Sequence, residues 1–171
     1  GAPNGTTIIV RNIFYNTPAR AKFLKSPQTE AGYITDLMEH MALSRPDISF
    51  KYMINQQLRF HTSGNGNTKE IIYRILGRET ADSLIEVKQD TKDLNIHGYI
   101  GNPLMNRASR NGENYFVNMR YVKSELIAKA IEEGYRGFLM QHKFPFCVLY
   151  FSVNPGKIDV NVHPTKMEVR F

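Results

Sequence analysis

The residues with the clearest chemical potential form a short run near the end of the chain, from His163 to Lys166 (His-Pro-Thr-Lys). Pro164 has a fixed φ and pushes the residue before it toward an extended backbone, so a stiff loop is expected here. A lysine on a stiff loop presents a compact positive charge, which suits a phosphate group. The alternative is an ordinary solvated lysine in a surface turn. Apolar and polar residues alternate on both sides of this run, which predicts two short strands: Val160 and Val162 before it, Val169 and Phe171 after it.

The chain has a net charge of +6, and its basic residues concentrate in two blocks. Residues 1–30 hold four basic side chains and one acidic side chain, and residues 100–143 hold seven basic and four acidic ones. The stretch between these blocks is close to neutral. If both blocks fold onto one face, a polyanion such as a nucleic acid is the expected partner. An ordinary basic surface without a partner is the alternative interpretation.

Other catalytic or ligand-binding patterns are weak. The 5 histidines are scattered, without paired spacing and without a cysteine partner, which argues against a zinc site. No serine lies in a nucleophile-elbow context. The stretch Ser63-Gly-Asn-Gly-Asn-Thr-Lys69 precedes a predicted helix and superficially resembles a phosphate cradle. It lacks the Walker spacing, so we interpret it as a plain loop that leads into a helix.

The composition predicts one compact domain. The chain has 171 residues, of which 42% are hydrophobic, enough for a real core. No stretch approaches the roughly 18 to 20 consecutive apolar residues of a membrane span, and no export leader is apparent. The single cysteine, Cys147, excludes an internal disulfide and favours a reducing, cytoplasmic location. It lies in an apolar stretch and is expected in the core.

The elements that must position these residues alternate between strands and helices. β-branched and alternating patterns predict strands over residues 6–11, 48–53, 58–62, 84–88, 94–101, 115–118, 121–122 and 146–153. A helix is expected to begin at Ser26-Pro27 and to end before Pro46. Two more helices are expected over residues 68–76 and 126–138, the latter capped by Ser124. The polar segment 102–114 is predicted to be an exposed or mobile loop.

This mixed order, without repeats or a linker, predicts a single domain over residues 1–171. The expected class is α+β, an α/β two-layer sandwich in which a mixed sheet has helices on one face.

Three segments together are similar to the MutL family of DNA mismatch repair proteins, over nearly the whole chain. They are residues 5–25 (GTTIIVRNIFYNTPARAKFLK), 115–123 (YFVNMRYVK) and 159–171 (DVNVHPTKMEVRF). The chain departs from the family pattern at Met119, where many relatives have glycine, and at Glu125, where some have a basic residue. The resemblance implies a fold like domain 2 of ribosomal protein S5, with a left-handed βαβ crossover. Periodicity alone would never predict that hand, because right-handed crossovers are the rule.

The resemblance also implies roles for individual basic residues. Lys166 corresponds to the family lysine that contacts the γ-phosphate of ATP in a neighbouring domain, which makes it the expected catalytic and cofactor-binding residue. A charge-assisted hydrogen bond of this kind is worth on the order of 1.5–3 kcal/mol, enough to sense whether the γ-phosphate is present. Lys25, Arg120 and Lys123 fall where the family lines a positively charged groove for DNA. Lys22 lies beside Lys25, close to a helix start, and is also expected to meet DNA phosphates.

The family's nucleotide-binding motifs do not occur in this sequence. Relatives bind ATP and Mg²⁺ with a domain of the gyrase/Hsp90/histidine-kinase/MutL type, which carries a metal-holding asparagine, an Asp-x-Gly-x-Gly run and a lid. The chain is therefore expected to be the transducer domain of a longer protein, inactive and without a bound cofactor on its own but part of an ATPase in the full-length protein. The implied partners are DNA, the protein's own N-terminal ATPase domain, a mismatch-recognition protein of the MutS type and a second copy in a homodimer, with no membrane.

Two other functions remain open from the sequence. The chain could be a stand-alone nucleic-acid-binding module of the same fold, with no nucleotide role. It could also be the transducer of a related topoisomerase or chaperone ATPase, although the Tyr15-Asn-Thr-Pro18 segment argues against that reading.

Overall fold

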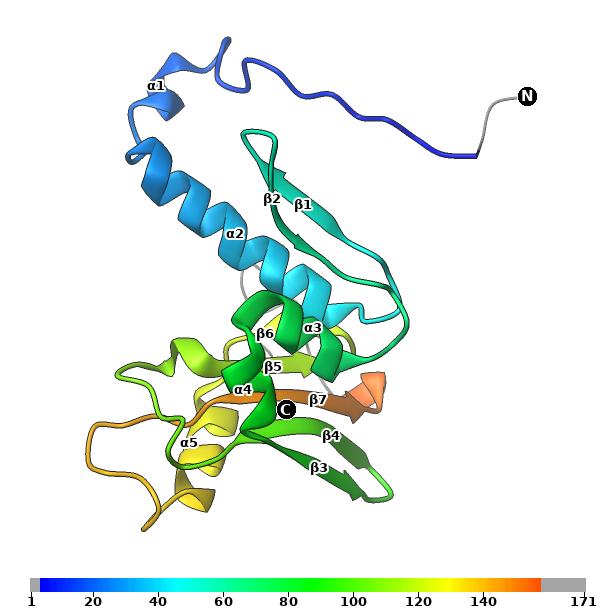
Figure 1. Cartoon of the computed structure of the whole chain (residues 1–171), viewed down its shortest axis with the longest axis vertical. Helices are drawn as coiled ribbons and strands as arrows, with labels where there is room; N and C mark the ends of the chain where they lie inside the picture. Colours follow the sequence, from blue (N-terminus) through cyan, green and yellow to red (C-terminus); the bar gives the residue numbers. More distant parts are fainter. Residues whose placement is uncertain (1–3, 158–171) are drawn as a thin grey trace. The chain divides into compact units, whose positions relative to one another are not determined.

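The computed structural model describes residues 4–157 of the chain (Figure 1). Two compact units are distinguished, Gly1–Thr35 and Asp36–Phe171, and each is described by itself. The prediction that residues 1–171 form a single domain therefore stays a prediction. The loop around Lys166 lies outside the described residues, so the strands predicted on both sides of it also stay predictions.

The first unit consists of an extended segment followed by helical turns. A short helix, α1, spans Pro18–Ala21, and α2 (Pro27–Ser44) begins in this unit. The Oγ atom of Ser26 accepts a hydrogen bond from the N–H of Thr29 at 3.2 Å, which confirms the predicted helix start.

The strand predicted over residues 6–11 is wrong for the described part of the chain. These residues pair with no other strand there, and Ile8 and Val10 are 82% and 70% exposed. The physical reason is that β-branched side chains only make a segment compatible with a sheet. A strand also needs backbone hydrogen bonds to a neighbouring strand. The described part of the first unit offers no such neighbour.

The second unit begins with the end of α2 and a β-hairpin. The helix ends at Ser44, before Pro46 as predicted, and its last turns bury Ala42 and Leu43. Strands β1 (Lys51–Ile54) and β2 (Gln57–His61) then pair antiparallel. Asn55 and Gln56 join them with φ angles of 49° and 66°, the left-handed values of a two-residue type I′ turn.

A five-stranded mixed sheet forms the main body of the second unit. Its strands are β3 (Leu84–Asp90), β4 (Leu94–Gly101), β5 (Glu113–Val117), β6 (Arg120–Val122) and β7 (Cys147–Val153). Their order across the sheet is β3-β4-β7-β5-β6, with β5 and β7 parallel and the other neighbours antiparallel. This arrangement confirms the predicted mixed α+β fold. The predicted left-handed crossover stays a prediction.

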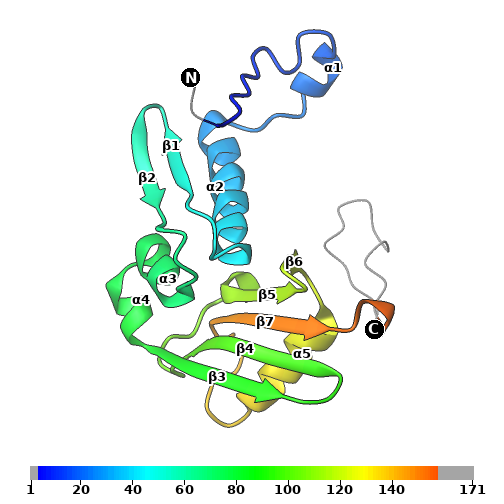
Figure 2. The same ribbon diagram turned by 90° about the vertical axis from the view of Figure 1, so that its right-hand side faces the viewer.

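Helices cover both faces of this sheet, not one face as predicted (Figure 2). On one face, Val148 and Tyr150 of β7 pack in a core with α3 (Thr68–Leu76) and the end of α2. On the other face, Leu149 and Phe151 pack with α5 (Glu125–Gly134). The cause lies in β7 itself, because its first five residues are all buried and apolar, the pattern of a strand that is covered on both sides.

Four short helical segments of the described residues were not predicted. They are α1, α4 (Arg78–Asp82), which follows α3 directly, and the 3-10 turns Arg110–Gly112 and Pro155–Lys157, the first of which lies in the segment predicted to be a loop. The predicted end of α3 at Gly77 is confirmed, since Gly77 has a φ of 87° and its N–H bonds to the carbonyl of Tyr73. Between residues 4 and 157, no helix has the length and apolar character that a membrane crossing requires.

A buried carboxyl group lies at the start of β5 and gives the second unit a predicted pH dependence. Glu113 is 5% exposed, its Oε2 atom pairs with the Tyr115 hydroxyl, and its Oε1 atom has no hydrogen-bond partner among the described residues. Burial raises the pKa of Glu113 above its ordinary value of 4.5. The folded state therefore prefers the protonated carboxyl.

We expect the free energy of unfolding to fall as the pH rises from about 4.5 toward neutrality, because the unfolded chain then releases this proton first. Below that range Glu113 is protonated in both states and imposes no penalty. The Glu113→Gln variant should lack this part of the pH dependence. Urea unfolding of both chains across this pH range measures the difference, and parallel curves would contradict the assignment.

Candidate nucleic-acid interface

The β5–β6 hairpin carries two of the predicted DNA-binding residues. Its turn consists of Asn118 and Met119, whose φ angles of 47° and 67° are both in the left-handed region. This is again a two-residue type I′ turn, which sharply reverses the chain. Arg120 follows the turn directly and Lys123 follows β6, so the structure brings both onto one short hairpin.

The charges of Arg120 and Lys123 are available to a ligand. Both residues are exposed, and within residues 4–157 no carboxylate lies within ion-pair distance of either. Arg110 differs, because its Nε and Nη2 atoms bond to the two carboxylate oxygens of Glu132 at 2.6 and 3.1 Å. Its guanidinium is therefore engaged in a structural pair.

Packing beneath the hairpin holds it in place. Tyr121 stacks on the ring of His40 from α2, with ring centroids 3.7 Å apart. The Nε2 atom of His40 lies 3.1 Å from the side-chain oxygen of Asn114. Burial lowers the pKa of His40, so its ring is neutral at pH 7 and adds no charge of its own. The hairpin that carries the basic side chains is thus packed against a neutral histidine ring, which is itself held by Asn114.

A cavity of about 940 Å³ in the second unit is lined in part by His40 and Tyr121. Arg107 and Lys123 line it, but so do the carboxylates of Asp36 and Glu39. Because opposite charges meet in the lining, the cavity does not favour a polyanion. The hairpin surface is the better candidate interface.

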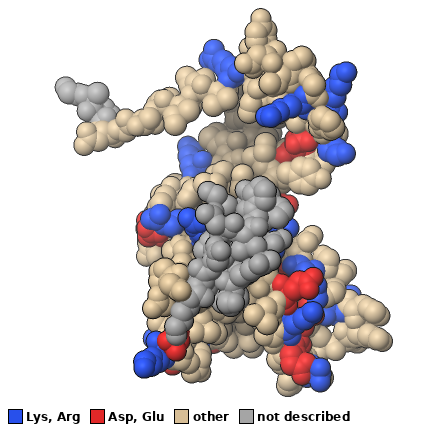
Figure 3. Space-filling model, turned by 180° about the vertical axis from the view of Figure 1, so that it is seen from behind, with Lys and Arg blue, Asp and Glu red and all other residues tan. Residues whose placement is uncertain are grey.

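Lys22 and Lys25 belong to the first unit. Both are exposed; Lys22 follows α1, and the backbone N–H of Lys25 bonds to the carboxylate of Glu30 at 2.8 Å. Whether they share a groove with Arg120 and Lys123 stays a prediction. In the space-filling view, basic side chains predominate in the first unit, whereas acidic and basic groups alternate over α5 (Figure 3). That alternation reflects ion pairs such as Lys129 with Glu125.

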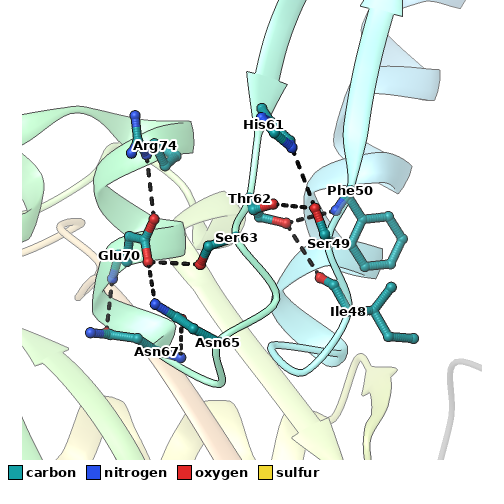
Figure 4. A network of polar contacts seen from close by, with 10 residues as sticks. All are labelled: Ile48, Ser49, Phe50, His61, Thr62, Ser63, Asn65, Asn67, Glu70 and Arg74. Atoms are coloured by element: carbon teal, nitrogen blue, oxygen red, sulfur yellow. Dashed lines mark hydrogen bonds and ion pairs between the residues drawn. The ribbon is translucent and has the colours of Figure 1, made fainter.

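The loop over residues 63–69 is a helix start and not a phosphate cradle, as interpreted from the sequence (Figure 4). Asn67 caps α3 by accepting a hydrogen bond from the N–H of Glu70 at 3.0 Å. The carboxylate of Glu70 in turn accepts from Ser63 at 2.8 Å and from Asn65 at 2.7 Å. These hydrogen bonds lower the pKa of Glu70. The donors of the loop are therefore turned toward the carboxylate of Glu70 in the first turn of α3, whose negative charge would repel a phosphate.

Comparison with known proteins identifies the family of the chain. Residues 72–171 match the family model described as "DNA mismatch repair protein, C-terminal domain". Over all 171 residues the chain is 59% identical to DNA mismatch repair protein MutL of Agathobacter rectalis, and 41% identical to that of Thermoanaerobacter pseudethanolicus. The chain belongs to the MutL family of DNA mismatch repair proteins. It spans 26% and 28% of the length of these two relatives.

Solved structures support the fold of this MutL-family chain. One, titled "Crystal Structure of N terminal domain of a DNA repair protein", matches with a TM-score of 0.74 at 23% identity; the match covers 92% of our chain and 53% of that one. The "Aquifex aeolicus MutL ATPase domain complexed with ADP" matches with a TM-score of 0.65 at 20% identity, over 85% of our chain and 52% of that one.

Sequence reasoning missed one residue of this interface, Asn118. Its amide Nδ2 donates to the carbonyl of Val153, and its Oδ1 accepts from the N–H of Val153, both at 3.0 Å. The sequence offers only an asparagine in a predicted tight turn, which has many uses. A contact between residues 35 positions apart becomes visible only once β5 and β7 are known to pair. In this MutL-family chain the turn of Asn118 and Met119, which directly precedes Arg120, is therefore hydrogen-bonded to the end of β7, the central strand of the sheet.

Proposed function

We propose that this chain is the transducer region of a MutL-type DNA mismatch repair protein. In this role the hairpin with Arg120 and Lys123 contacts the DNA backbone, and Lys166 reaches the γ-phosphate of ATP in an adjoining ATPase domain. The observation that carries the DNA role is the pair of exposed cations, without ion-pair partners in the described region, on a firmly packed hairpin. Such groups bind phosphates without reading base sequence.

The nucleotide and its Mg²⁺ would be held by the ATPase domain of the longer protein. The one phosphate-like loop of the described region donates hydrogen bonds to the Glu70 carboxylate at the start of α3, so that loop does not fit a nucleotide phosphate. Among residues 4–157, no cluster of side chains suits a metal ion either. We infer that Lys166 is this region's contribution to ATP turnover, and that the region is inactive alone.

Contact with that ATPase domain is supported by apolar residues of the first unit. Ile8, Ile9 and Val10 are 82%, 69% and 70% exposed, although their β-branched side chains favour a sheet. A strand partner outside the described residues would pair their backbone groups and cover these side chains. We infer that this segment joins the neighbouring ATPase domain.

Membership of the MutL family supports the wider role that we propose. ATP binding would close a homodimer in the bacterial cytosol, and the closed state would pass the signal of a MutS-type protein bound to mismatched DNA on to strand removal. Hydrolysis would remove the γ-phosphate that anchors Lys166 and release the loop, an order–disorder switch.

The DNA role predicts a salt-dependent loss of binding when the two cations are removed together. The double variant Arg120→Gln/Lys123→Gln should bind a short DNA duplex on the order of tenfold more weakly at low salt. The plot of log binding constant against log salt concentration should become less steep, by about 0.9 for each DNA phosphate that the variant no longer neutralises. Fluorescence anisotropy at several salt concentrations measures both quantities.

The matched control is Lys88→Gln/Lys129→Gln, which removes the same net charge. Both lysines are exposed but pair with carboxylates, at 3.4 Å for Lys88 with Asp90 and 3.7 Å for Lys129 with Glu125. This control should bind DNA nearly as the parent chain does. If both double variants lose the same DNA affinity, net charge alone governs binding. That result would contradict the assignment of the hairpin as the DNA interface.

A further inference from the structure

A buried carboxyl group with an unsatisfied oxygen lines the cavity of the second unit. Glu113, at the start of β5, is 5% exposed and belongs to the lining of this cavity of about 940 Å³. Its Oε2 atom pairs with the Tyr115 hydroxyl, whereas its Oε1 atom has no hydrogen-bond partner among the described residues. Because a buried polar atom without a partner is costly, this carboxyl group calls for a donor that the described chain does not supply.

Two further carboxyl groups, from α2, line the same cavity. Asp36 and Glu39 lie one turn apart on α2, and the end of this helix lies next to β5 (Figure 2). Within residues 4–157, no lysine or arginine lies within ion-pair distance of Asp36, Glu39 or Glu113. Burial raises the pKa of Glu39 and of Glu113, and the charge of Asp36 raises the pKa of Glu39 further. A cation bound in the cavity would offset this cost of burying carboxylates.

The negative groups of the lining lie deeper than the positive ones. Glu113 is buried and Glu39 is half-buried, whereas Arg107 and Lys123 are exposed. The guanidinium of Arg110, which also lines the cavity, is already paired with Glu132. A small cation that enters the cavity therefore meets carboxylates in its interior, and the free basic groups stay at its exposed border.

The rest of the lining is largely apolar and aromatic. Leu43 of α2, Leu76 of α3 and Tyr121 of β6 belong to it. The volume lies within the range of about 300–1,000 Å³ that small-molecule pockets have. Carboxylates on two elements together with apolar walls suit a molecule that carries several ammonium groups on a hydrocarbon stem, and aromatic faces also attract ammonium groups. No cluster of side chains in the described range 4–157 suits a metal ion, so an organic cation is the better match.

We propose that this cavity binds an aliphatic polyamine, with one ammonium group at Glu113 and another at Asp36 and Glu39 of α2. The site goes beyond the proposed function, because none of these three carboxyl groups is assigned to DNA or to ATP. Loss of the DNA or ATP role would therefore leave this proposal intact, and its own failure would leave those roles intact.

The experiment titrates the intact parent protein with spermidine, without DNA, and measures the dissociation constant by calorimetry. Glu113→Gln and the double variant Asp36→Asn/Glu39→Gln remove charge and keep the size of the side chains. Each should weaken spermidine binding by at least about tenfold, because an ammonium group then lacks its ionised partner. The matched control is Asp82→Asn/Asp90→Asn, which removes two exposed carboxylates outside the cavity lining. It should bind spermidine within about twofold of the parent.

A second titration distinguishes a free polyamine from a lysine side chain of a partner protein. Its probe is Nα-acetyl-lysine amide, which carries a single ammonium group on a similar stem. This compound should bind at least about tenfold more weakly than spermidine, because it can reach only one of the two acidic positions at a time.

The other outcomes overturn the inference. If the parent does not bind spermidine, or both cavity variants bind it as tightly as the parent, the cavity is not a polyamine site. If only one of two folded cavity variants loses affinity, the ligand does not span the two acidic positions. If the control loses as much affinity as the α2 variant, net charge alone attracts spermidine. If the lysine amide binds as tightly as spermidine, one ammonium group suffices and the ligand class is wrong. Should Glu113→Gln not fold, the α2 variant and its control decide the question.

Discussion

Replacing Lys166 by alanine in the intact parent protein is expected to lower the rate of ATP turnover by roughly 10- to 100-fold. The physical reason is the loss of the charge-assisted hydrogen bond to the γ-phosphate that we propose for Lys166, which would be worth about 1.5–3 kcal/mol. A contact to the phosphate that departs gains strength as negative charge develops on it, so the loss should appear mainly in the turnover number. Steady-state phosphate release, measured with saturating ATP and Mg²⁺, tests this.

The Lys166→Arg variant preserves the positive charge and should retain more turnover than the alanine variant. It should not restore the full rate, because a planar guanidinium does not reproduce a compact ammonium. Lys88→Ala is the matched control: Lys88 is exposed on β3 and pairs with Asp90, so its loss should leave turnover unchanged. Normal turnover in the Lys166→Ala protein would contradict the nucleotide role. It would favour the alternative of a stand-alone nucleic-acid-binding module.

Local signals in the sequence predicted where the three longer helices begin and where α3 ends, whereas α5 ends at Gly134 and not at residue 138 as predicted. The Ser26-Pro27 start, the Gly77 end of α3 and the Ser124 cap are each decided by one or two residues and their nearest backbone groups. The cap of α5, for example, is a hydrogen bond from the N–H of Ile127 to Ser124. Short-range features of this kind are written in the sequence itself.

Long-range features were harder to predict, because they depend on what lies beside each strand. β7 displays an unbroken apolar run that fits either an ordinary core strand or one covered on both faces. The segment 102–114 looked like a polar loop, yet Arg107 pairs with Phe144 in a β-bridge and Arg110 with Glu132. In each case the partner lies more than twenty residues away, where no local pattern reveals it.

The candidate site shows the same division. Arg120 and Lys123 could be singled out from their charge, the turn and the family resemblance. The contacts that fix them, from Tyr121 to His40 and from Asn118 to Val153, join different elements and follow only from the sheet order. Charge and turn propensity thus predict which residues can meet DNA, whereas topology decides what moves with them.

Replacing Gly98 by alanine is expected to destabilise the fold by more than about 3 kcal/mol. Gly98 lies in β4 opposite Leu149 of β7, with a φ of 137° that side chains rarely adopt. A Cβ atom there would lie 2.2 Å from the carbonyl oxygen of Val148 and 3.1 Å from the Cα of Leu149. Both contacts are with backbone atoms, so no side-chain rotation relieves them and the two strands must separate.

Gly134→Ala is the matched control in the same unit, because a Cβ atom at this position of α5 meets nothing within 4 Å. That variant should be as stable as the parent chain or slightly more so, by up to about 1 kcal/mol. Urea unfolding followed by circular dichroism compares the three proteins. If Gly98→Ala unfolds within about 1 kcal/mol of the parent, the close approach of β4 and β7 is incorrect. The position of Val153 next to Asn118 depends on that approach, because β4 pairs with the whole of β7. The pairing runs from Ile100 opposite Cys147 to Leu94 opposite Val153.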